Sequence, residues 1–160
     1  MNMMKYMCLS SLSFISLLVI TPAFAQPFAY ITNVNDNTVS IINTANNIVV
    51  DTVNVGDSPV GIAISPDGSF VYVANTDSNN VSVINTFNNT VVANVSVGAF
   101  PIGLAITPDG SFVYVTNANS HDISIIDTST NTAVDTVGVG VTGQWGIEVS
   151  PDGSFVYASD

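Results

Sequence analysis

The chain has 160 residues, with twelve carboxylates against a single Lys or Arg, one His, one Cys and a net charge of −11. Because almost no cationic side chain is available to neutralise phosphates, the composition excludes nucleic-acid binding and disfavours an anionic membrane surface. One cysteine allows neither a disulfide framework nor a thiolate metal site.

Residues 1–25 predict a secretory signal peptide. Lys5 precedes a long apolar and serine-rich run that ends in Ala-Phe-Ala, the order of segments found in such peptides. We expect cleavage between Ala25 and Gln26, and hence an extracytoplasmic protein (periplasmic, cell-surface or secreted) without membrane insertion after signal removal. A retained membrane anchor is the alternative, but the run is short for a spanning helix and Pro22 interrupts its end.

The remaining residues repeat with a period of 42 or 43 residues. Several columns keep this spacing, and the clearest is the tyrosine column: Tyr30, Tyr72, Tyr114 and Tyr157. A fixed period of this length is typical of repeat architectures in which each repeat is one supersecondary unit.

Each period predicts four short strands. In chain order, the second period has an apolar strand at 61–65, a Pro-Asp-Gly turn, and strands at 70–75, 81–86 and 90–97. Connections this short make neighbouring strands antiparallel, and strands that are apolar on both faces must be covered on both faces. Such a unit is a β-propeller blade. A flat β-sandwich is the alternative, but it would not impose one repeat length.

The domain at residues 26–160 is therefore predicted to be all-β and a partial β-propeller. Residues 28–55 supply three strands of a blade, 58–97 and 100–139 supply two full blades, and 143–159 supply the first half of another. About three and a quarter blades cannot close a ring, so we expect an open arc with apolar blade faces exposed at both ends. Such faces favour self-association, or a chain that is a truncated form of a longer propeller; we favour truncation.

The repeats also resemble a known family. FVYVAN at 70–75 and FVYVTN at 112–117 follow Pro-x-Gly-[Ile/Leu]-Ala-Ile-[Ser/Thr]-Pro-Asp-Gly and precede VSVINT or ISIIDT. This order is similar to the YVTN-type β-propeller repeat of secreted and cell-surface proteins in bacteria and archaea. The resemblance implies a seven-bladed ring whose central channel is lined by the first strand of each blade. Propellers similar in outline act as lactonases, with a metal on channel carboxylates, or as subunits of periplasmic redox enzymes.

Glu148 is a candidate site residue because it occupies the position of Ala63 and Ala105 in the first strand. The resemblance places this strand at the channel, where a carboxylate is able to act as a metal ligand or general base. The alternative is a charge tolerated on a face that is open to water.

His121 and Asp122 are weak metal-ligand candidates. Three consecutive residues cannot converge as a Ser-His-Asp triad, and the positions aligned with His121 are Asn37 and Asn79, so a polar loop variant is the simpler interpretation. The Asp- and Asn-rich loops at 33–37, 75–80 and 117–122 suit calcium chemically, but none matches a known calcium loop.

Two further features are ambiguous. One carboxylate recurs in every Pro-Asp-Gly triplet, and it is either part of a ring of ligands or a turn residue; the members are Asp67, Asp109 and Asp152. Gln144 and Trp145 depart from the repeat, and an exposed Trp is able to anchor a sugar or a partner.

The sequence thus predicts a non-enzymatic binding or surface-interaction scaffold, with no catalytic residue, cofactor or firm metal site. The expected partners are an unidentified protein, a surface glycan or a further copy through the open blade faces. The alternative is a fragment of a propeller enzyme, either a lactonase-like hydrolase or a periplasmic redox-enzyme subunit.

Overall fold

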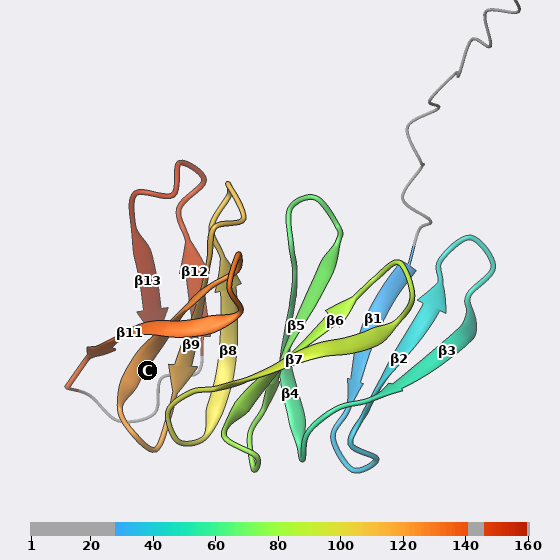
Figure 1. Cartoon of the computed structure of the whole chain (residues 1–160), viewed down its shortest axis with the longest axis horizontal. Helices are drawn as coiled ribbons and strands as arrows, with labels where there is room; N and C mark the ends of the chain where they lie inside the picture. Colours follow the sequence, from blue (N-terminus) through green and yellow to red (C-terminus); the bar gives the residue numbers. More distant parts are fainter. Residues whose placement is uncertain (1–27, 141–145, 160) are drawn as a thin grey trace, which may run out of the picture.

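The computed structural model describes residues 28–140 and 146–159, and all of its regular structure there is β-strand (Figure 1). The strands are β1 (Phe28–Asn33), β2 (Thr38–Asn43), β3 (Ile48–Asn54), β4 (Pro59–Ile64), β5 (Phe70–Asn75), β6 (Asn80–Asn85), β7 (Thr90–Ser96), β8 (Pro101–Ile106), β9 (Phe112–Asn117), β10 (Asp122–Asp127), β11 (Thr132–Gly138), β12 (Gly146–Val149) and β13 (Val156–Ser159).

The strands form four antiparallel sheets in chain order. β4–β7 and β8–β11 are complete four-stranded blades, β1–β3 is a three-stranded sheet and β12–β13 is a hairpin. The sheets stand side by side along the long axis of the molecule and do not close into a ring (Figure 1). The predicted all-β fold of four-stranded blades in an open, partial propeller is confirmed.

The alternation along β5 explains how blades adhere to each other. Val71 and Val73 pack with Val39 and Ile41 of the preceding sheet. Tyr72 points the other way and packs with residues of the following blade, Val113 and Val115 among them. A strand that is apolar on both faces therefore joins two blade interfaces, and each fully buried valine contributes roughly 1.5–3 kcal/mol.

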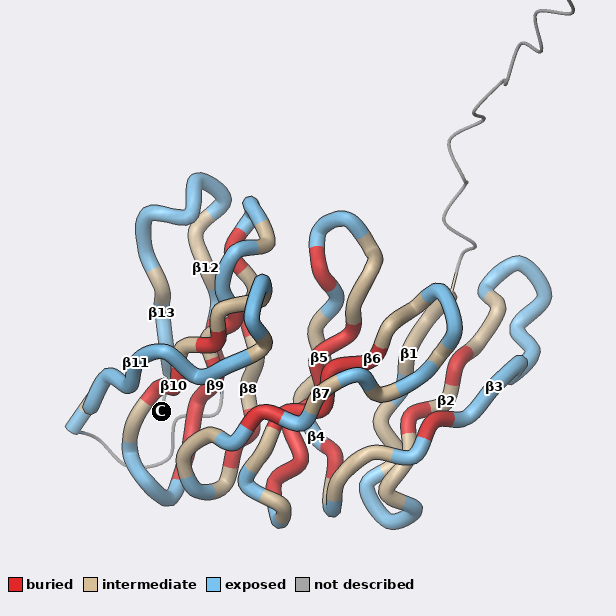
Figure 2. The backbone as a smooth tube through the Cα atoms, viewed as in Figure 1, coloured by how far each residue is buried: buried red, intermediate tan, exposed pale blue. Residues whose placement is uncertain are grey.

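Burial is concentrated in the middle of the arc (Figure 2). Nearly every residue of β5 and β6 is buried, whereas β11 is exposed throughout and β13 is exposed apart from Val156. Large apolar side chains stay open to solvent at both ends, including Ile31 on β1 and Phe155 and Tyr157 in the terminal hairpin. The end faces of the arc are thus unpaired surfaces of the kind that propeller interfaces normally cover.

The first strands of successive blades form a row along the inner side of the arc. β4 lies beside β8, and β8 lies beside β12. The approach is close: a Cβ atom placed on Gly61 would lie 1.9 Å from the carbonyl oxygen of Ile102. Glycine is required at this position because the neighbouring backbone occupies the space of a side chain.

Candidate functional site

The blades present two rims, and the Pro-Asp-Gly turns form one of them. Ser65 donates its hydroxyl to the Asp67 carboxylate (2.6 Å), and the Ser69 amide donates to the same oxygen (3.0 Å). Gly68 takes a φ of +74°, which the turn needs and which glycine adopts without strain. The same bonds recur around Asp109 and Asp152.

Asp67, Asp109 and Asp152, called here the turn carboxylates, have strongly lowered pKa values. The hydrogen bond from Ser65, followed by the backbone bond from Ser69, lowers the pKa of Asp67 to about 2. The corresponding Thr107 and Ser150 hydroxyls lead the causes that lower the pKa of Asp109 and of Asp152 to about 2. A carboxylate held in its ionised form by its own turn is a poor proton donor or acceptor near neutral pH.

A cavity of about 250 Å³ lies between two successive turns and is lined in part by Asp67 and Asp109. Burial raises the pKa of Tyr72, which also lines this cavity, and the charge on Asp67 raises it further. Both carboxylates are used by their turns, and within residues 28–140 and 146–159 no group of three His, Cys, Asp or Glu side chains is placed to hold a metal ion. The role that these contacts support for Asp67 and Asp109 is stabilisation of their Pro-Asp-Gly turns.

At the opposite rim, the asparagines shared by the predicted strands and the Asn-rich loops that follow them are the last residues of the strands and are buried. Asn75 has no exposed surface, and its Nδ2 donates to Asn80 Oδ1 (2.7 Å) and Ser82 Oγ (2.8 Å). Asn117 repeats the arrangement with Asp122 Oδ1 (2.6 Å) as one acceptor. The suggestion of calcium ligands at these residues is not supported, because the amides and Asp122 bind one another within the blade.

His121 lies in the tight turn between β9 and β10 with a φ of +58°. The aligned Asn37 and Asn79 share this conformation and accept backbone hydrogen bonds, at 2.9 Å, from Ser58 and Phe100 in the connections to the following blades. The backbone amide of His121 donates to Asn117 O (2.9 Å). Its place in the fold is thus that of a left-handed turn residue at a blade junction.

Glu148 is exposed on β12, where it stands opposite Tyr157 in the terminal hairpin. The other two candidates lie elsewhere: His121 is in the turn between β9 and β10, and Asp122 is the first residue of β10. Gln144 and Trp145, like the expected cleavage position at Ala25 and Gln26, lie outside the described residues.

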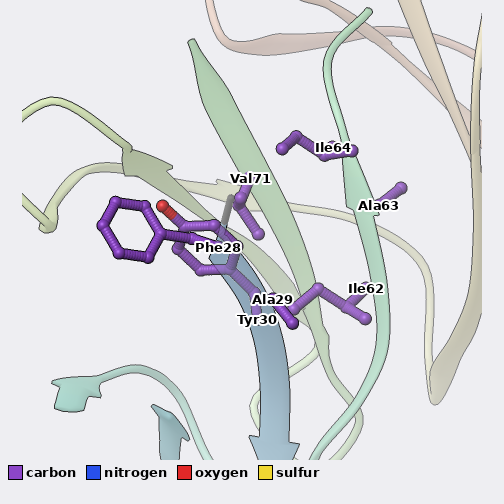
Figure 3. A pocket seen from close by; sticks show the side chains of 7 residues that line it. All are labelled: Phe28, Ala29, Tyr30, Ile62, Ala63, Ile64 and Val71. Carbon is purple, nitrogen blue, oxygen red and sulfur yellow. The ribbon is translucent and has the colours of Figure 1, made fainter. Parts of the chain in front are cut away.

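A second cavity, of about 240 Å³, was not foreseen from the sequence. It lies between β1 and β4, with apolar side chains of the two strands facing it, and is lined by Phe28, Ala29, Tyr30, Ile62, Ala63, Ile64 and Val71 (Figure 3). The only signal in the sequence was that the first blade begins with its second strand.

The chain is a β-propeller protein. The sequence model of the family "Lactonase, 7-bladed beta-propeller" matches residues 61–134, which are part of the two complete blades. No curated protein matches the chain.

Solved propeller-like structures are similar over most of the chain. Hydrazine synthase of Kuenenia stuttgartiensis matches with 30% identity and a TM-score of 0.80, over 82% of this chain and 38% of that one. The dihydro-heme d1 dehydrogenase NirN in complex with DHE matches with 22% identity and a TM-score of 0.68, over 79% of this chain and 28% of that one. The second likeness shows the fold alone. The chain thus spans well under half the length of either protein.

No helix in the described part of the chain has the length and apolar character needed to cross a membrane.

Proposed function

We propose that the protein is an extracytoplasmic β-propeller module of the YVTN type that serves as a non-enzymatic binding scaffold. One observation carries the proposal: the carboxylates that recur in the turns, and Asp122 at the opposite rim, are engaged in hydrogen bonds within the blades. The turn carboxylates accept hydrogen bonds from their own turns, and Asp122 accepts one from Asn117. What remains for recognition is the broad rim and edge surface that repeat folds offer.

The proposed ligand is a protein or a surface glycan, and the proposed contact is the segment with Gln144 and Trp145. Trp145 is the one tryptophan of the chain. Its fluorescence therefore reports on this segment without interference from a second tryptophan. Titration with a panel of soluble bacterial surface polysaccharides is expected to shift or quench this emission for at least one of them, and Trp145→Ala is expected to weaken binding measured by calorimetry tenfold or more. An unchanged affinity in Trp145→Ala would remove this segment from the binding surface.

A lactonase-like hydrolase is the second candidate, because the matched family carries that name. The residue to test is Glu148, the exposed carboxylate of the inner strand row. We expect no hydrolysis of γ- and δ-lactones by pH-stat, with or without added Ca²⁺, Mg²⁺, Mn²⁺ or Zn²⁺. Metal-dependent turnover that is lost in Glu148→Gln, but kept in the matched acidic variant Asp135→Asn on β11, would overturn the scaffold proposal. A role as a subunit of a larger enzyme is a third outcome, because the chain resembles part of hydrazine synthase, and co-purification with a partner protein tests it.

A further inference from the structure

The first sheet of the arc lacks a strand that both complete blades have. β4 pairs with β5 and β8 pairs with β9, but among the described residues no strand pairs with the equivalent edge of β1. The cavity of about 240 Å³ lies at this edge (Figure 3). We call the space bounded by its seven lining residues the vacant lane. It continues the row of first strands formed by β4, β8 and β12.

The register of the missing strand follows from the complete blade. In β4, Ile62, Ala63 and Ile64 stand opposite Val73, Tyr72 and Val71 of β5. One period earlier, a strand in the vacant lane would stand opposite Ile31, Tyr30 and Ala29 of β1. Val73 is fully buried, whereas its counterpart Ile31 is 49% exposed. An unpaired strand edge beside exposed apolar side chains is a template for strand addition.

The close spacing between neighbouring first strands restricts which sequences fit in the vacant lane. A side chain at Gly61 would overlap the carbonyl oxygen of Ile102 on the next first strand. A strand in the vacant lane stands in the same relation to β4, so its residue aligned with Gly61 would face the Val60 carbonyl and must also be glycine. The preceding segment of this chain, residues 17–22, has Val19 at that position. Its sequence therefore does not meet the requirement.

Two positions further on, the lane requires a small apolar residue. Ala63 and Ala105 hold this position in the complete blades, and Ala105 is buried against the next first strand. In the vacant lane the same position faces Ile62 and Ile64, where an unpaired charge is strongly unfavourable. β12 of a second copy has the required Gly146 but places Glu148 here, so a second copy is a poor occupant.

We propose that the vacant lane is a strand-acceptor site for an extended partner segment of the type Gly-[Ile/Leu]-Ala-Ile, supplied from outside these 160 residues. β4 and β8 are two segments of this type, and both are already paired. Main-chain hydrogen bonds along β1 provide affinity, and the glycine and alanine positions provide specificity. The site is separate from the Trp145 segment and the turn carboxylates, so it does not depend on the function proposed above.

The test is fluorescence anisotropy of a labelled peptide with the sequence of residues 58–69, SPVGIAISPDGS, titrated with the purified protein. Saturable binding is expected. Peptides carrying Gly61→Val or Ala63→Glu are expected to bind at least tenfold more weakly. Equal binding of all three peptides, or no binding at millimolar protein, would overturn the proposal.

A variant of the protein locates the binding. Ile64 is 51% exposed and lines the lane, so Ile64→Glu is compatible with folding but places a carboxylate beside the bound strand. Val50, equally exposed on β3 and outside the lane, provides the matched control Val50→Glu. Peptide affinity is expected to fall at least tenfold in the first and to stay unchanged in the second, with the far-ultraviolet circular dichroism of both intact. A stable dimer in sedimentation that the peptide fails to dissociate would assign the lane to a second copy and overturn the partner named here.

Discussion

Gly61→Ala tests the closest approach between two blades. The added Cβ would lie 1.9 Å from the carbonyl oxygen of Ile102 and 3.1 Å from its carbonyl carbon. Both atoms belong to the backbone of β8, so no flexible side chain is able to move aside. The inner strands β4 and β8 must therefore separate by more than an ångström for alanine to fit.

The expected loss of stability is large for a single methyl group. Overpacking a well-packed interior costs about 1–3 kcal/mol and sometimes more, and here the whole inner row must shift. Alanine also reduces the entropy of the unfolded chain, which offsets about 0.4–1 kcal/mol of that loss. Taking the upper end of the overpacking cost, we expect a net destabilisation of about 2 kcal/mol, which lowers the unfolding temperature by roughly 5–10 °C for a domain of this size.

Urea and thermal unfolding followed by circular dichroism measure this effect, with Gly138→Ala as the matched control. A Cβ on Gly138 would meet no atom within 4 Å, and its backbone needs no positive φ. The control is expected to unfold within about 0.5 kcal/mol of the parent protein. If Gly61→Ala unfolds at the same midpoint as the control, the close packing of the inner row is wrong, and with it the glycine requirement of the vacant lane.

The remaining predictions concern acidity, turn geometry and processing. The pKa values of the turn carboxylates fall from 3.8 to about 2 on folding. The stability that they contribute is therefore complete above about pH 4 and is lost as the pH falls from about 4 to about 2. In a variant with all three replaced by Asn, the unfolding temperature is expected to fall less steeply over this pH range. His121→Asn is expected to retain full stability, whereas His121→Val places a β-branched residue at a φ of +58° and is expected to cost about 1–2 kcal/mol in urea unfolding; equal stability of the two would contradict the turn role. Mass spectrometry of the exported protein is expected to find Gln26 as the first residue, and an intact N-terminus would refute the signal peptide.

Most of the fold could be predicted because its determinants are local. FVYVAN combines β-branched and aromatic residues, and β5 spans the six predicted positions. The Pro-Asp-Gly triplet predicts a tight turn with glycine in the left-handed region, and Gly68 has that conformation. Val71 and Tyr72 point to opposite faces because a strand has a two-residue period, and the two side chains belong to different core clusters.

The polar interior could not be predicted, because it depends on contacts between strands. Asparagine usually indicates a loop, yet Asn75 is fully buried since Ser82 on the adjacent strand accepts its amide. Phe100 adopts a φ of +62°, a conformation that its own residue type disfavours. The Asn79 side chain accepts a hydrogen bond from the Phe100 amide and holds this connection in place.

The candidate site shows the same division between local and distant determinants. The turn role of Asp67 could be inferred from the triplet that contains it, and the structure adds the Ser65 hydroxyl whose hydrogen bond lowers the pKa of this carboxyl group to about 2. The vacant lane could not be inferred, because it requires β1 and β4 to be placed relative to each other in space. The clash at Gly61 likewise belongs to a neighbour 41 residues away in the chain.

Hydrogen exchange of the buried asparagine side-chain amides reports on the opening of individual blades. Asn75 and Asn117 bind two acceptors each while fully shielded from solvent. Side-chain amide protons held in this way exchange with deuterium only when the blade opens, so their lifetimes record the opening of individual blades. Asn33 makes the same pair of bonds in the first sheet but is partly exposed. Its exchange should therefore be the fastest of the three, and it should slow when a strand occupies the lane beside β1.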